Sequence, residues 1–272
     1  EISLEHPVAE DINIIVLADM RSDFTEEEFR NFDAYLERGG NLFILGEPKR
    51  QQFMNPVIER LGLRFADGII VSPSEVNLDD LVAANIKEGA AKVSENYIRY
   101  FRSGYSIMTP SACAVEVIDS TKGFEITEVL ASAGKGSWVE KETTDFINEK
   151  SVLNPAVGEV EKSNSIMLYL TRPVNNKEQR IFVIGDADCI STLELSQNRP
   201  GFRSSNFTLI TETFRNLSYG EFPVEASRVN PPDDRVLVTR NVIFGIRVVL
   251  MWIIPLLFVT GCITLLIRRK RR

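Results

Sequence analysis

The sequence predicts a three-layer α/β fold, in which helices cover both faces of a mostly parallel β-sheet. One C-terminal transmembrane helix follows it. Three observations predict this. A strand–helix–strand unit occupies residues 12–46, a further apolar strand over 180–186 ends in acidic residues, and residues 248–267 carry no charge. Strands joined by helical crossovers run parallel, and the helices cover the faces of the sheet.

The first unit carries a signal at each of its boundaries. Residues 12–18, INIIVLA, form a β-branched apolar run that is typical of a strand buried on both faces. Thr25 and Glu28 then stand at the spacing of a capping box, which begins a helix. Gly39 ends that helix, and residues 41–46, NLFILG, form the next strand. We therefore expect a parallel pair of strands joined by one helix.

Shorter patterns predict the remaining elements. These are a helix over 52–61, a strand or hairpin over 63–71, strands over 112–119 and 124–133, a hairpin of strands 165–171 and 180–186, and a helix over 205–217. Asn175 and Asn176 favour a tight turn in the hairpin, which we expect near the end of the sheet. A serine at 204 or 205 is expected to cap the last helix. Residues 77–105 are weakly periodic and are not placed, and 134–164 predict an irregular loop region.

The apolar run near the C-terminus predicts a membrane span. Twenty helical residues cover roughly 30 Å, the thickness of the hydrocarbon core of a bilayer. We assign residues 242–267 to a transmembrane helix and the five cations of 268–272 to a cytoplasmic tail, because Lys and Arg collect on the cytoplasmic side. A buried core helix is the alternative, but core helices rarely stay uncharged for this length.

This orientation places the rest of the chain outside the cytoplasm, which in a bacterium is the periplasm. Residues 1–220 are then an extracytoplasmic domain, and 221–241 are a connector in which RVLVT, 235–239, is expected to add a short strand. Because residue 1 is Glu, we expect an export signal or membrane anchor upstream of it. A tail-anchored protein with a cytosolic domain is the alternative, but its basic tail would lie on the wrong side.

The charge distribution argues against nucleic acid as a partner. The chain holds 31 cations and 38 acids, and Arg247 and the basic tail account for six of the cations. Residues 1–246 therefore carry 25 cations against 38 acids, a net charge of −13. Binding to phosphate groups or anionic lipid surfaces needs clustered Lys and Arg, so we expect membrane lipid to contact only the helix over 242–267.

The residue types that common enzymes need are scarce. His6 is the single histidine and lies near the N-terminus, which argues against Ser-His-Asp and Cys-His catalysis and against histidine zinc sites. The sequence contains no Walker or Rossmann phosphate-binding loop, so an ATPase would be another subunit. Cys189 follows two acids, which raise a thiol pKa and suppress the thiolate. Cys113 and Cys189 form a disulfide or stay free and buried, and the sequence leaves both alternatives open.

Charged residues directly follow three of the predicted strands. The candidate ligand-binding residues at these strand ends are Asp19, Arg21, Glu47, Asp186 and Asp188. In an open parallel sheet, ligands bind beyond the carboxyl ends of the strands. Three interpretations stay open: turn and capping groups, contacts to a polar or carbohydrate-like ligand, or a Mg²⁺ or Ca²⁺ site that supports hydrolysis. We favour the first for the stretch IFVIGDADCIS, 181–191.

Several of these segments together resemble one family of transport proteins. They are DMRSDFTEEEFRNFDAYLERGGNLFILGEP (19–48), IFVIGDADCIS (181–191), and WIIPLLFVTG (252–261) before the basic tail. In these stretches the chain resembles the gliding-motility-associated ABC transporter auxiliary proteins, also described as substrate-binding proteins. The resemblance runs from about residue 10 to the end and is weakest over 77–164.

The resemblance implies a fold and a set of partners. It implies a periplasmic domain similar to the class I glutamine amidotransferase-like fold, anchored in the bacterial inner membrane. It also implies association with the permease and ATPase subunits of an ABC transporter, without identifying the transported substrate. A non-enzymatic accessory subunit with no metal and no cofactor is therefore expected.

Overall fold

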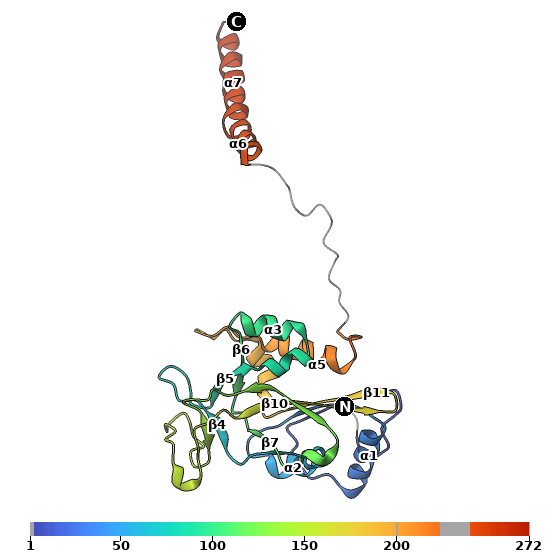
Figure 1. Cartoon of the computed structure of the whole chain (residues 1–272). Helices are drawn as coiled ribbons and strands as arrows, with labels where there is room; N and C mark the ends of the chain where they lie inside the picture. Colours follow the sequence, from blue (N-terminus) through green and yellow to red (C-terminus); the bar gives the residue numbers. More distant parts are fainter. Residues whose placement is uncertain (1–2, 200, 224–239, 272) are drawn as a thin grey trace. The chain divides into compact units, whose positions relative to one another are not determined.

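The computed structural model describes residues 3–199, 201–223 and 240–271 (Figure 1). The chain divides into two units, Glu1–Val224 and Glu225–Arg272. The strand predicted over 235–239 and most of the predicted connector over 221–241 lie outside the described residues.

The first unit is built on a seven-stranded sheet with strand order β1-β2-β11-β10-β8-β5-β6. The strands are β1 (Ile14–Ala18), β2 (Asn41–Leu45), β11 (Lys177–Ile184), β10 (Ser165–Val174), β8 (Glu125–Ala131), β5 (Leu81–Ile86) and β6 (Ser106–Pro110). β1, β2 and β11 run parallel, and every other neighbouring pair is antiparallel. The α/β class is confirmed, but the sheet is mixed, so the prediction of a mostly parallel sheet is wrong. Hairpin-type pairing, which needs no helical crossover, builds the half of the sheet from β10 to β6.

Helices cover both faces of this sheet, which gives the three layers that the sequence predicts (Figure 1). α1 (Glu26–Glu37) and α2 (Gln51–Ile58) pack on one face, and α3 (Glu95–Arg102) and α5 (Asn206–Leu217) pack on the other. Successive side chains of a strand point to opposite faces. Leu42 of β2 therefore belongs to the core beside α1 and α2, while Phe43 belongs to the core beside α3 and α5.

Shorter elements surround the sheet. They are β3 (Leu63–Phe65), β4 (Ile69–Val71), β7 (Val115–Val117), β9 (Trp138–Glu140), α4 (Thr192–Ser196), and the 3₁₀ turns η1 (Glu59–Leu61), η2 (Glu88–Lys92), η3 (Ser120–Lys122), η4 (Pro155–Val157) and η5 (Asp188–Ile190). The run predicted as one strand or hairpin over 63–71 is two strands with different partners, since β3 pairs with β7 and β4 pairs with β9. Residues 134–164 are irregular apart from β9 and η4, as expected.

The predicted start of α1 and the predicted turn of the hairpin are confirmed, but β10 and β11 each extend three residues further into the turn than predicted. The N–H of Glu28 donates to Thr25 Oγ1 at 3.2 Å, and the N–H of Thr25 donates to Glu28 Oε2 at 2.7 Å, which completes the capping box. Asn175 and Asn176 have φ values of 48° and 65°, the left-handed pair that a tight β10–β11 turn requires. The hairpin lies in the middle of the sheet rather than near its end, because β11 also pairs with β2.

The second unit is a long apolar helix. α6 (Arg240–Val248), a π-helical turn (η6, Val249–Ile253) and α7 (Ile254–Lys270) follow one another directly. Its 29 residues over Val242–Lys270 are long and apolar enough to cross a membrane, which is consistent with the predicted anchor. The hydroxyls of Thr260 and Thr264 donate to carbonyls one turn earlier, at 2.9 and 2.7 Å, so the helix itself satisfies them.

Candidate functional site

The carboxyl ends of β1, β2 and β11 border one surface hollow of about 300 Å³, which we call the strand-end hollow. Its lining residues are Asp19, Arg21, Glu47, Pro48, Lys49, Arg50, Ala187 and Asp188. Four of the five predicted site residues therefore line one hollow. The fifth, Asp186, is fully buried and is not part of the lining.

Asp19 is held by two guanidinium groups. It follows β1 with a φ of 42°, a left-handed conformation that Asp tolerates better than most residues. Its Oδ2 accepts from Arg21 Nη2 at 2.6 Å, and its Oδ1 accepts from Arg50 Nε at 3.3 Å. Arg50, at the start of α2, was not predicted as a site residue. Its position between the strand predicted over 41–46 and the helix predicted over 52–61 is the feature of the sequence that could have indicated it.

Glu47 is the half-buried acid of the hollow. Burial raises its pKa to about 7, with contributions from the negative charges of Asp188 and Asp19. At neutral pH the carboxyl is therefore divided between its neutral and its charged form. It offers a ligand a hydrogen-bond donor or an acceptor at the same position.

Asp186 has the capping role that we favoured for the stretch 181–191. Its Oδ1 accepts from the backbone N–H of Asp188 at 2.8 Å and of Cys189 at 3.2 Å, which holds the turn η5. Among the described residues, its Oδ2 has no hydrogen-bond partner. Burial, followed by the negative charge of Glu47, raises the pKa of Asp186 well above its ordinary value. Both effects favour a protonated carboxyl below the hollow.

The two cysteines of this unit are free thiols. Cys113 and Cys189 are both buried and unpaired, which decides between the two alternatives that the sequence left open. Burial raises the pKa of both thiols, and nearby acids raise it further, Glu47 for Cys113 and Asp186 for Cys189. A protonated and buried thiol is a poor nucleophile.

The acids of the hollow are not arranged around a common point. Within residues 3–199, 201–223 and 240–271, no group of three or more His, Cys, Asp or Glu side chains is placed to hold a metal ion. The oxygens of Asp19 face guanidinium groups instead. The strand-end hollow therefore presents donors and acceptors suited to a polar organic ligand, and it lacks the cluster of oxygen ligands that Mg²⁺ or Ca²⁺ prefers.

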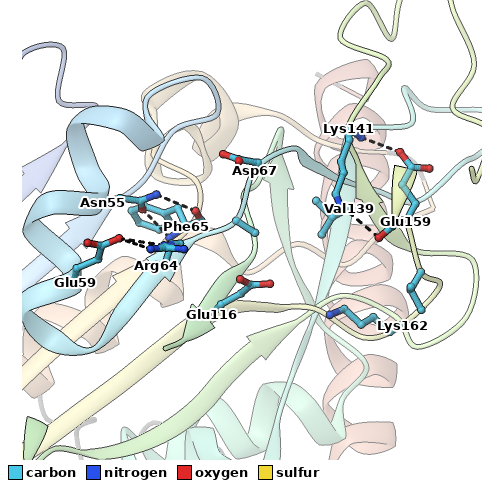
Figure 2. A pocket seen from close by; sticks show the side chains of 13 residues that line it. Asn55, Glu59, Arg64, Phe65, Asp67, Glu116, Val139, Lys141, Glu159 and Lys162 are labelled. Carbon is cyan, nitrogen blue, oxygen red and sulfur yellow. Dashed lines mark hydrogen bonds and ion pairs between the residues drawn. The ribbon is translucent and has the colours of Figure 1, made fainter. Parts of the chain in front are cut away.

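A second and larger hollow, of about 480 Å³, was not predicted (Figure 2). It lies between α2, β3 and β7 on one side and the segment 139–162 on the other, and we call it the seam hollow. Its lining residues are Asn55, Glu59, Arg64, Phe65, Ala66, Asp67, Glu116, Val139, Lys141, Gly158, Glu159, Val160 and Lys162. No sequence signal marked it, because its residues come from several segments that only tertiary structure brings together.

Comparison with known proteins shows similarity of fold alone. No protein-family model and no curated protein matches the chain. Among solved structures, the N-terminal domain of mmIFT52 superimposes with a TM-score of 0.53 at 16% identity, covering 77% of this chain and 78% of that one. A ThuA-like protein from Parabacteroides merdae gives a TM-score of 0.41 at 11% identity, covering 81% and 74%, and no conclusion follows from it. The resemblance to the ABC transporter auxiliary proteins stays a prediction.

Proposed function

We propose that this chain is a non-enzymatic, membrane-anchored accessory subunit of an ABC transporter. The observation that carries the proposal is the apolar helix Val242–Lys270, which follows a folded α/β unit in the chain. The cations Arg268, Arg269 and Lys270 at one end of the helix favour the cytoplasmic side for that end. In this proposal the α/β unit lies in the periplasm and the helix in the bacterial inner membrane.

The chemistry of the strand-end hollow supports a binding role over a catalytic one. Asp19 is engaged by Arg21 and Arg50, Asp186 caps a turn, and the thiol of Cys189 is buried. General acid–base catalysis needs a group that is free to exchange a proton with the substrate. Glu47 has a suitable pKa, but the lining of the hollow contains no His, Ser, Thr or Cys to act with it.

Two finer parts of the proposal have separate support. A relationship to the class I glutamine amidotransferase-like fold is supported by the parallel strands β1, β2 and β11 with helices on both faces. The link to gliding-motility transporters is supported by the sequence resemblance over 19–48, 181–191 and 252–261.

Affinity capture tests the proposal. The tagged chain is extracted from its native membrane in a mild detergent, captured, and analysed by mass spectrometry. We expect permease and ATPase subunits of an ABC transporter to be recovered with it. The matched control replaces residues 242–267 with an unrelated single-span helix of the same length. Recovery of the native chain without any transporter subunit would count against the proposal.

Protease added to intact spheroplasts tests the orientation separately. We expect digestion of the α/β unit and protection of the cytoplasmic end of the helix. Protection of the α/β unit until detergent is added would place it in the cytoplasm and would contradict the periplasmic assignment.

A second candidate function is a binding module for a polar or carbohydrate-like ligand at the strand-end hollow. The guanidinium groups of Arg21 and Arg50 and the carboxyl of Glu47 favour it, since all three line the hollow. N-acetylglucosamine and glucose serve as probes in thermal shift measurements. The candidate predicts a rise in Tm that Arg50→Met abolishes, and the absence of a rise with both sugars would argue against it.

A further inference from the structure

One wall of the seam hollow is held by buried carboxylates rather than by regular secondary structure. Glu140 Oε1 accepts from the backbone N–H groups of Glu142 and Thr143, both at 3.0 Å. Glu159 accepts from the N–H of Lys141 at 2.9 Å and of Asn154 at 2.7 Å. Charge-assisted hydrogen bonds of this kind are stronger than neutral ones, so the wall is fixed before any ligand binds.

The same wall has a small apolar core of its own. Ile69, Val71, Trp138 and Phe146 are buried together, with Leu153 packed against them. The pairing of β4 with β9 lies within this core, and the N–H of Ile70 in β4 donates to the carbonyl of Ala112 at 2.8 Å, which joins it to the rest of the unit. The seam hollow therefore lies between two separately packed parts of one folded unit, a common location for ligand sites.

The opposite wall is fixed by side-chain contacts around β3. Asn55 Nδ2 donates to the carbonyl of Phe65 at 3.1 Å, and the N–H of Phe65 donates to Asn55 Oδ1 at 2.9 Å (Figure 2). Arg64 donates to Glu59 Oε1 through Nε at 3.0 Å and Nη2 at 2.9 Å. The charges of Arg64 and Glu59 are therefore paired with each other within the wall.

Five other charged side chains line the hollow, and none of them forms a salt bridge within the described part of the chain. The carboxylate of Glu159 is occupied by its two backbone N–H donors, which leaves four charges. Asp67 and Glu116 lie on the side of α2 and β3, while Lys141 and Lys162 lie on the opposite side (Figure 2). The Lys141 ammonium donates to the carbonyls of Val157 at 3.2 Å and Gly158 at 3.4 Å, which position it without neutralising it. Two negative charges thus face two positive charges across the hollow, and the carboxylate of Glu159, held by backbone N–H groups, lies on the side of the lysines.

We propose that the seam hollow binds a zwitterionic ligand of the size of a di- or tripeptide. Its ammonium would lie near Asp67 and Glu116, and its carboxylate near Lys141 and Lys162. A simple anion would meet the two acids, and a simple cation would meet the two lysines, so a ligand with both charges fits best. Phe65, Val139 and Val160 line the same hollow and offer apolar surface for a side chain. The volume of about 480 Å³ lies within the range of small-molecule sites.

Calorimetry on the full chain in detergent tests this inference, with the dipeptide alanyl-leucine as the probe. Its N-acetylated form lacks the ammonium, and its C-terminal amide lacks the carboxylate. We expect alanyl-leucine to bind and each blocked form to bind at least about tenfold more weakly, because each loses one charged contact. No heat of binding at about 5 mM alanyl-leucine, or equal affinity for the blocked forms, would overturn the proposal.

Two substitutions on opposite walls locate the site. Asp67→Asn and Lys162→Met each remove one free charge from an exposed side chain, and each should raise the Kd for alanyl-leucine about tenfold. Glu75→Gln and Lys135→Met are the matched controls, since both positions are exposed and neither lines the hollow. An unchanged Kd in both wall variants would also overturn the proposal. Circular dichroism checks that the variants remain folded.

This inference stands apart from the proposed transporter role. The calorimetry needs the purified chain alone, so its failure leaves the affinity capture result unaffected. Conversely, recovery of the chain without transporter subunits would leave the ligand measurement unaffected.

Discussion

The two hollows of the α/β unit differ in what their charges face. In the strand-end hollow, Asp19 is paired with Arg21 and Arg50, and burial keeps Glu47 partly protonated. In the seam hollow, Asp67 and Glu116 lie opposite Lys141 and Lys162 without forming an ion pair within the described residues. The difference teaches that acids at the ends of strands can be engaged by interactions within the fold, as Asp19 is by its ion pairs. Charges that form no ion pair within the protein remain available to a ligand.

The two hollows also differ in what holds them in shape. Next to the strand-end hollow, between the end of β11 and the lining residues Ala187 and Asp188, two backbone segments approach closely at Gly185. The seam hollow depends on hydrogen bonds from the backbone to buried carboxylates such as Glu140. Substitutions at these supports should therefore affect stability by different mechanisms and to different extents.

The largest effect is expected from Gly185→Ala. A Cβ at this position would lie 1.9 Å from the carbonyl oxygen of Cys113, and that backbone is fixed by the Cys113 N–H, which donates to the Gly185 carbonyl at 2.8 Å. We expect the free energy of unfolding, measured by urea denaturation, to fall by about 3 kcal/mol or more. Gly134→Ala is the control, because nothing lies within 4 Å of its Cβ. Equal stabilities of the two variants would show that the contact at Gly185 is not a constraint.

A smaller effect is expected from Glu140→Gln, which acts on the seam hollow. Burial raises the pKa of Glu140, but hydrogen bonds from Thr143, Glu142 and Trp138 outweigh it, so the pKa lies below its ordinary value. The ionised carboxylate therefore stabilises the fold above about pH 4.5, and this contribution is lost as the pH falls. We expect the substitution to cost about 2 kcal/mol at pH 7 and less at acidic pH.

Denaturation at several pH values checks this expectation. Glu149→Gln is the matched control, because Glu149 is exposed in the same segment. A cost for Glu140→Gln that is the same at every pH would contradict the role assigned to the charge.

The smallest effect is expected from Glu47→Gln in the strand-end hollow. The pKa of Glu47 is raised to about 7 in the folded chain, while in the unfolded chain the group ionises near its ordinary value. Stability that is present at acidic pH is therefore lost as the pH rises toward 7. We expect the variant to match the native Tm near about pH 4 and to exceed it by about 4 °C at about pH 8, because partial exposure of the side chain reduces the full linkage effect.

The exposed acid Glu75 provides the control for this measurement. Glu75→Gln should leave the pH dependence of Tm unchanged, because the side chain is exposed and belongs to neither hollow. The raised pKa of Glu47 would be contradicted if the difference in Tm between Glu47→Gln and the native chain were the same at acidic and at neutral pH.

Elements with local signals were predictable from the sequence. Thr25 and Glu28 mark the start of α1 within four residues of each other, and Asn175 with Asn176 marks the β10–β11 turn. β5 and β6 were not predicted, because they lie within or next to the weakly periodic stretch over 77–105 and are stabilised by pairing with each other and with β8. The order of strands in the sheet depends on such long-range pairing, which explains why a mostly parallel sheet was expected.

The candidate site follows the same rule. Asp19, Glu47 and Asp188 converge because parallel strands end at the same edge, which the sequence made predictable. Two details of the site were not predictable. The inward orientation of Asp186 depends on the backbone of η5, and the contact between Asp19 and Arg50 depends on the path of the chain after β2. The seam hollow was beyond prediction, because β3, β7 and the segment 139–162 are distant in sequence.

The buried thiols have a consequence for the environments that the fold tolerates. Cys113 and Cys189 are enclosed by the core, and their raised pKa values keep them in the unreactive form. While the α/β unit stays folded, these two cysteines offer no disulfide for a reductant to break and no accessible thiolate for an oxidant to attack. Its stability should therefore be the same under oxidising and reducing conditions, and its folding needs no disulfide-forming step.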